Sequence, residues 1–148
     1  MTIVHGRGEG HARYAARGSE MWFKALGALD DGDLSVMERT LPPGGRRPPA
    51  HRHTNCSEGY FVLEGRIEVE IEGTPHELGP EDFVLVARGQ AHTFGNPGTA
   101  PARLLVLHAP AMDAYFAELH RLWQDGATPS VEEERALMAR FGMERAGD

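Results

Sequence analysis

The chain has 148 residues and a single cysteine, so it cannot form an internal disulfide. Disulfides are rare in reducing compartments, and this cysteine content is typical of a cytoplasmic protein. The sequence also lacks an apolar run long enough to cross a bilayer, and its first residues lack the apolar segment of a signal peptide. We therefore expect a cytoplasmic protein that has no membrane as a partner.

Positive charge is scarce in this sequence. Lys and Arg number 15 and Asp and Glu number 22, which gives a net charge of −7 at pH 7. An acidic chain has little attraction for a nucleic-acid backbone or an anionic membrane surface, so we expect neither as a partner. The hydrophobic content of 41% and the chain length fit one globular domain with its own core.

The most informative stretch of the sequence runs from Gly45 to Gly65. His51 and His53 are separated by one residue, so on a β-strand both imidazoles point to the same face. Glu58 follows on the next expected strand, and a further histidine, His92, comes later in the chain. Imidazoles and carboxylates are ligands that divalent transition metals prefer. The spacing therefore predicts parts of a metal site.

This spacing resembles the two sequence motifs of the cupins. The first motif reads glycine, five residues, H-x-H, three or four residues, E, six residues and glycine. Its defining positions here are Gly45, His51, His53, Glu58 and Gly65. The second motif is matched by Gly89, His92 and Asn96, with Gly79 as its opening glycine. Ala87 stands where that motif has proline, a departure that concerns a turn and not a ligand.

The resemblance implies a mainly β fold, the cupin jelly-roll barrel, around one divalent transition metal. In the family this ion is iron, manganese, nickel, copper, cobalt or zinc, and its ligands would be His51, His53, Glu58 and His92. Glu58 could stay bound or leave the metal to act as a catalytic base. Four protein ligands leave positions for a substrate, or for a substrate and dioxygen. A metal that only stiffens the barrel is the alternative, although structural sites are usually closed by their ligands.

The periodicity divides the chain into three parts. We expect a loosely held N-terminal arm over residues 1–19, the barrel over 20–110, and a C-terminal helical extension over 111–148 that packs on the barrel or on a partner subunit. The arm carries His5 and His11, which we expect to be solvated. In the barrel, Ile67 to Ile71 alternates strictly with glutamates and predicts a half-buried strand.

Two further barrel segments carry specific expectations. Phe83 to Val86 is predicted as a short buried strand. In the strand from Leu34 to Leu41, one of two alternating faces should line the barrel, and polar residues on that face would contact substrate. A half-solvated edge strand is the other interpretation of this segment.

After Pro110 the spacing of apolar residues changes from two to about 3.6, the period of a helix. An apolar stripe predicts a first helix from Met112 to Trp123. Ser130 and Glu133 form a capping box that predicts the start of a second helix, and Gly142 fits its C-terminal end. A two-helix tail resembles the small bacterial cupins called quercetin-dioxygenase-like. Cupins commonly pair through barrel edges, so the resemblance also implies a homodimer.

Three residues are expected to line a substrate pocket: Tyr60, Phe94 and His108. A core tyrosine and a histidine satisfied near a strand end are the alternatives for Tyr60 and His108. Cys56 lies in the loop between His53 and Glu58, and we interpret it as a loop or core cysteine without a role at the metal.

Three functions fit these expectations. The first is a metal-dependent dioxygenase-type enzyme acting on a small enolisable or aromatic substrate. The second is a redox-neutral isomerase, decarboxylase or polyketide-cyclase-like enzyme that uses the cation to stabilise an enolate. The third is a non-catalytic module that binds a small ligand. The fold supports all three, so the choice depends on the site.

Overall fold

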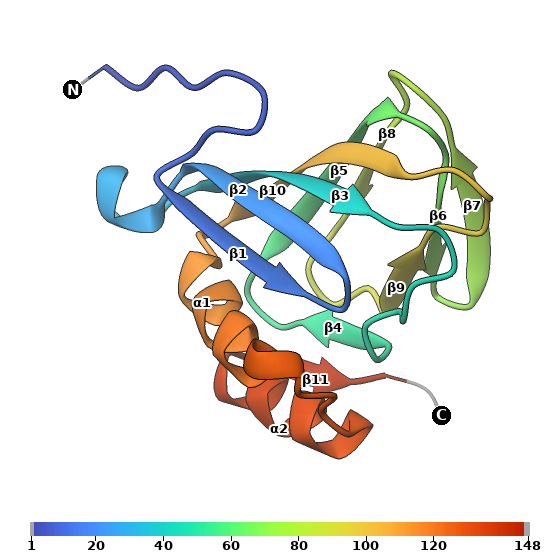
Figure 1. Cartoon of the computed structure of the whole chain (residues 1–148). Helices are drawn as coiled ribbons and strands as arrows, with labels where there is room; N and C mark the ends of the chain where they lie inside the picture. Colours follow the sequence, from blue (N-terminus) through green and yellow to red (C-terminus); the bar gives the residue numbers. More distant parts are fainter. Residues whose placement is uncertain (1, 147–148) are drawn as a thin grey trace.

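The computed structural model describes residues 2–146 as two antiparallel sheets with two helices at one end of the barrel (Figure 1). The larger sheet contains, in spatial order, β1 (Ala12–Ala16), β2 (Ser19–Ala25), β3 (Ser35–Leu41), β10 (Ala102–Ala109), β5 (Ser57–Glu64) and β8 (Phe83–Val86). The smaller sheet contains β11 (Met143–Arg145), β4 (His51–His53), β9 (His92–Gly95), β6 (Ile67–Ile71) and β7 (Thr74–Leu78). This is the predicted mainly β jelly-roll.

The core consists of the inward members of the alternating strands together with buried residues of the two helices, such as Leu119 and Met138. On β6, Ile67 and Val69 are fully buried, while Glu68 and Glu70 between them are half-buried on the outer face. This confirms the half-buried strand that the alternation predicts. Met37 on β3 and Leu104 on β10 are also fully buried and belong to the same core.

The helical extension covers the end of the barrel near β4. Helix α1 (Asp113–Leu122) packs against β1, and α2 (Val131–Arg140) packs against α1 and β11. The predicted capping box is present: Glu133 N donates to Ser130 Oγ at 3.1 Å, and Ser130 N donates to Glu133 Oε1 at 3.1 Å. Gly142 follows α2 with a φ of 76°, which favours glycine at the end of a helix.

The strand β11 is a part of the extension that the sequence does not reveal. It pairs with β4, placing Met143 opposite His53 and Arg145 opposite His51. On its other side β4 pairs with β9. Three residues are too few to show an alternating pattern in the sequence, and only the pairing with β4 identifies this strand.

The N-terminal segment is shorter as an arm than expected. Residues 12–16, which the sequence assigns to a loosely held arm, form β1 and pair with β2 from Ala12 opposite Phe23 to Ala16 opposite Ser19. Arg17 and Gly18 connect the two strands with φ values of 54° and 76°. A two-residue turn with positive φ at both positions matches the twist of a hairpin. The Arg17-Gly18 pair is therefore the local sequence feature that indicates a strand on each side of it.

The expectation of a buried strand at Phe83–Val86 is wrong. Strand β8 is an edge of the larger sheet, and the side chains of Phe83 and Leu85 are 56% and 57% exposed, while Val86 is buried. Short apolar runs look alike in sequence whether one face or both faces are covered. Within residues 2–146, no helix is long and apolar enough to span a membrane.

Candidate metal site

Three histidines meet where β4 and β9 pair at the inner face of the smaller sheet. His51 lies opposite His92 in the ladder, and their ring centroids are 4.4 Å apart. His53, two residues along β4, has ring centroids 5.1 Å from His51 and 5.3 Å from His92. All three are buried, and one nitrogen of each lies within 4.8 Å of the others.

Glu58 reaches this group from β5 of the opposite sheet. Its Oε2 lies 3.2 Å from His53 Nε2, and its Oε1 lies 3.5 Å from His92 Nε2. Burial alone raises the pKa of Glu58, but the charge and hydrogen bond of His108, with hydrogen bonds from His53 and His92, hold it well below its usual value. Glu58 is therefore a carboxylate at neutral pH.

The tautomers of two histidines follow from their backbone contacts. His51 Nδ1 donates to Pro49 O at 2.8 Å, and His92 Nδ1 donates to Gln90 O at 3.0 Å. A carbonyl can only accept, so Nδ1 carries the proton and each neutral ring keeps a lone pair on Nε2. Burial, and then the charge of His92, lower the pKa of His51 to about 3, which keeps that ring neutral.

These residues fit a divalent transition metal. His53 Nε2 and His92 Nε2 are buried, and neither has a hydrogen-bond partner of good geometry in the described part of the chain. Buried polar atoms are normally satisfied, so two imidazole nitrogens without a well-aligned hydrogen bond, beside a carboxylate, are suited to binding a cation. Burial lowers the pKa of His92, but the hydrogen bond and charge of Glu58 outweigh it and raise that pKa.

His108 belongs to the same constellation. It lies on β10 directly opposite Glu58 in the ladder with β5, and its Nε2 donates a very short hydrogen bond to Glu58 Oε2. His53, Glu58 and His108 form a second group whose ligand atoms lie within 4.8 Å of one another. Glu58 is therefore held between His108 on one side and the three-histidine group on the other.

The site opens into a small internal cavity of about 20 Å³, room for about one water molecule. The residues expected to line a pocket, Tyr60, Phe94 and His108, all line this cavity. The hydroxyl of Tyr60 is buried and has no hydrogen-bond partner within residues 2–146. Cys56 does not line the cavity. Its Sγ donates to Pro110 O at 3.3 Å, and burial, then the charge of Glu58, raise its pKa to about 11.

Two arginines in the cavity wall were missed by sequence reasoning. Arg39 comes from β3 and Arg17 from the β1–β2 turn, and both line the cavity. The signal for Arg39 was present, because it alternates with Met37 and Leu41 on the face that turned out to be inward. Arg17 gave no signal, because its position depends on the hairpin and on contacts with the helical extension.

A larger groove of about 540 Å³ lies against the outside of this wall, along α2 and β11. Three residues line both the groove and the cavity: His51, Met138 and Met143. These side chains therefore form the partition between the metal site and the groove. The helical extension thus supplies two of the three residues that close the site.

Comparison with known proteins identifies a domain in the central part of the chain. Residues 37–108 match the model of the cupin domain, and this range contains both motifs, Gly45 to Gly65 and Gly79 to Asn96. A predicted oxalate decarboxylase of Thermotoga maritima has the same fold, with a TM-score of 0.62 and 21% identity over 74% of this chain and 99% of that one. The chain therefore carries a cupin domain, as its motifs predict.

The curated relatives match this chain over only part of their own length. The polyketide synthase CurC of Streptomyces cyaneus is 29% identical over 106 residues, covering 67% of this chain and 68% of that protein. The 5-nitrosalicylic acid 1,2-dioxygenase of a Bradyrhizobium species is 28% identical over 81 residues, covering 55% of this chain and 38% of the dioxygenase. The chain spans less than half the length of most curated relatives that it matches.

Proposed function

We propose that this chain is a mononuclear metal-dependent enzyme of the dioxygenase type that acts on a small enolisable or aromatic substrate. The observation that carries the proposal is the buried group of His51, His53 and His92, with Glu58 beside it, 3.2 Å from His53 Nε2 and 3.5 Å from His92 Nε2. Similarity to a dioxygenase that acts on an aromatic acid supports oxygen chemistry for the group. The quercetin-dioxygenase-like class remains a prediction within this proposal.

Each residue has a distinct task in this proposal. The three histidines and Glu58 would hold one iron, manganese, nickel, copper, cobalt or zinc ion, which polarises a bound substrate and, if redox-active, exchanges an electron with it. Glu58 is ionised and buried beside the site, so it can accept a proton from an enolisable carbon or a hydroxyl. The hydrogen bond from His108 orients this carboxylate. Phe94 and Val106 give the cavity apolar walls, which limit the water around a bound substrate.

The metal content of protein purified without chelator tests this proposal first. We expect about one equivalent of metal in the wild type and none in the His51→Ala/His92→Ala double variant. His76→Ala is the matched control, because His76 is an exposed histidine on β7. Oxygen uptake is then measured with flavonols, diketones and hydroxybenzoates. Metal absent from both proteins, and not taken up on reconstitution, would overturn every metal-dependent reading.

A redox-neutral enzyme is the second candidate. Of the two curated relatives described above, this chain covers more of the polyketide synthase protein. A cation that stabilises an enolate requires no oxygen. Activity with zinc and without air would favour this candidate. Binding of a small ligand without turnover, under either metal, would favour the non-catalytic module.

A homodimer remains a proposal, supported by the exposed apolar side chains of Phe83 and Leu85 on edge strand β8. Uncovered apolar edges favour association with another strand. Sedimentation of the wild type beside the Phe83→Lys/Leu85→Lys variant tests it. We expect the wild type to be a dimer and the variant a monomer, and a monomeric wild type contradicts the proposal.

A cytoplasmic location stays a prediction based on the single free cysteine.

A further inference from the structure

Arg39 is a buried charge without a carboxylate partner. Its residue surface is 2% exposed, and its guanidinium lies 4.9 Å from the centroid of the Phe94 ring. Nε donates to Ser19 Oγ at 2.8 Å, and no aspartate or glutamate of the described chain forms an ion pair with it. Burial, and then the charge of Arg17, lower the pKa of Arg39 to about 9 against the opposing charge of Glu58, which lies beyond ion-pair distance, so Arg39 remains a cation at neutral pH.

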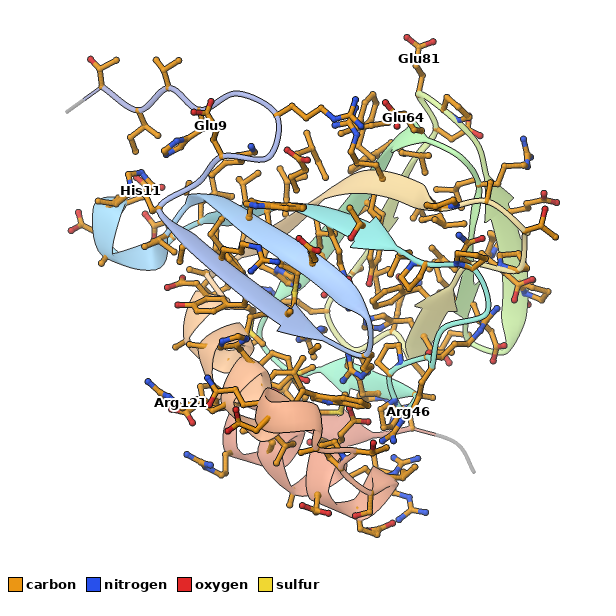
Figure 2. All side chains as sticks on the ribbon, viewed as in Figure 1. Glu9, His11, Arg46, Glu64, Glu81 and Arg121 are labelled. Atoms are coloured by element: carbon orange, nitrogen blue, oxygen red, sulfur yellow. The ribbon has the colours of Figure 1, made fainter. Side chains whose placement is uncertain are left out.

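Arg17, in the same cavity wall, has the partner that Arg39 lacks. Arg17 Nε lies 2.7 Å from Glu134 Oε1, and Arg46 Nη2 lies 2.7 Å from Glu134 Oε2. The same carboxylate also accepts from Trp123 Nε1 at 2.9 Å. Figure 2 shows Arg46 where the barrel meets the helical extension. This cluster of Arg17, Arg46, Glu134 and Trp123, the Glu134 cluster, retains one net positive charge behind the cavity.

The charges around the cavity leave a deficit of negative charge. Glu58 cancels only one of the two charges of a divalent cation held by neutral histidines, and Arg39 adds another positive charge. Charges enclosed in protein are expensive unless they are paired. Two more residues that line the cavity carry a buried donor without an acceptor within residues 2–146, the hydroxyl of Tyr60 and Nη2 of Arg17.

We propose that Arg39 binds the anionic group of the substrate, and that the substrates of this site are small organic carboxylates carrying a second oxygen donor. A guanidinium matches a carboxylate with two parallel hydrogen bonds, and its two Nη groups make no hydrogen bond to the described protein. The second oxygen would approach the histidines and Glu58. That part of the inference rests on the proposed metal-dependent function, whereas carboxylate binding by Arg39 does not.

The route for such a substrate leads through the groove along α2 and β11. The cavity of about 20 Å³ is too small for a carboxylate with a carbon skeleton, but the groove of about 540 Å³ is large enough. Met138 and Met143 stand between the two spaces. Methionine side chains are unbranched and change rotamer readily, so rotation of these two would join groove and cavity.

Paired binding titrations test the proposal on zinc-loaded protein, which does not turn over through oxygen chemistry. The probes are salicylate, malonate and oxalate, each beside its amide, which keeps the shape and removes the charge. We expect wild type to prefer the carboxylate, and Arg39→Gln to bind it about 10- to 100-fold more weakly with unchanged amide binding. Arg66→Gln is the control, since Arg66 is an exposed arginine paired with Glu77.

Two further readouts separate the possible failures. Metal content should be the same in Arg39→Gln and in wild type, and its melting temperature without added anion should be equal or higher, because an unpaired buried charge has been removed. Repeating the titrations on metal-free protein separates this inference from the proposed function, since a charge preference there depends on Arg39 and not on the metal. Equal binding of carboxylate and amide, or of carboxylate by wild type and Arg39→Gln, overturns the proposal.

Discussion

Arg17 and Arg39 line the same cavity and both are buried, but only one of them forms an ion pair. Arg17 is paired with Glu134, and Arg39 has no carboxylate partner in the described chain. A paired buried charge holds elements together, because removing either partner leaves the other uncompensated. An unpaired buried charge costs stability, and it persists where a ligand completes it. Whether a carboxylate of the protein pairs with the arginine, and not how deeply the arginine is buried, therefore distinguishes a structural role from a binding role.

The largest loss of stability should come from breaking the ion pair between Arg17 and Glu134. Glu134→Gln leaves Arg17 buried without its countercharge and weakens the contact of α2 with Arg46. We expect a loss of about 3–5 kcal/mol in the free energy of unfolding, measured by urea denaturation. Glu132→Gln is the control, because Glu132 is an exposed residue of the same helix. A loss as small as the control's would show that the cluster contributes little.

The candidate metal site is a third case of buried charge, in which the charges of Glu58 and His92 depend on pH. The folded pKa of Glu58 lies well below its ordinary value of 4.5, so its contribution to stability is present above pH 4.5 and is lost as pH falls through the folded pKa. The folded pKa of His92 lies above its ordinary value of 6.5, so its contribution is present below pH 6.5 and is lost as pH rises through the folded pKa.

Metal-free protein should therefore be most stable between these two limits. Melting temperatures from pH 3 to pH 9, with and without zinc, measure this dependence. Zinc should remove the decline on the alkaline side, because it replaces the proton on the imidazoles and favours their neutral form. A decline on the alkaline side that zinc leaves unchanged would show that His92 does not share its site with the cation.

The role of the unpaired arginine is tested by Arg39→Met, which keeps an unbranched apolar stem and removes the charge. Ser19 Oγ loses the donor Arg39 Nε but still donates to Thr40 O at 2.5 Å. We expect stability between unchanged and about 2 kcal/mol higher by urea denaturation, since the lost contact with the Phe94 ring offsets part of the gain. A loss of the size expected for Glu134→Gln would place Arg39 with Arg17 as a structural residue.

The smallest effect should follow from Ser130→Ala, which removes the side-chain cap of the helix that carries Glu134. The expected loss is about 1 kcal/mol, the usual worth of an N-cap serine. Thermal melting measures it, and Ser130→Asp, which restores an acceptor at the cap, should recover most of the loss. The carboxylate affinity of the cavity should not change, because Arg39 lies on β3 and not on the helical extension.

Much of this site could be anticipated from local spacing. The H-x-H pair needs only the alternation of a strand to share a face, and β4 provides it. The position of Arg39 could be predicted only in part. Alternation puts Arg39 on the same face as Met37 and Leu41, but it does not indicate which face of the strand is inward. The exposure of Phe83 and Leu85 was not visible, because an edge strand and a central strand can have the same apolar composition.

The sequence by itself determined the cupin motifs, the alternating strands, the capping box and the residue types suited to a metal, because each depends on contacts within a few residues. Only the tertiary structure decided that β11 completes the sheet beside β4, that His108 meets Glu58, and that Glu134 pairs with Arg17 while Arg39 stays unpaired. Such contacts join positions up to 117 residues apart, and a linear pattern carries no information about which distant charges meet.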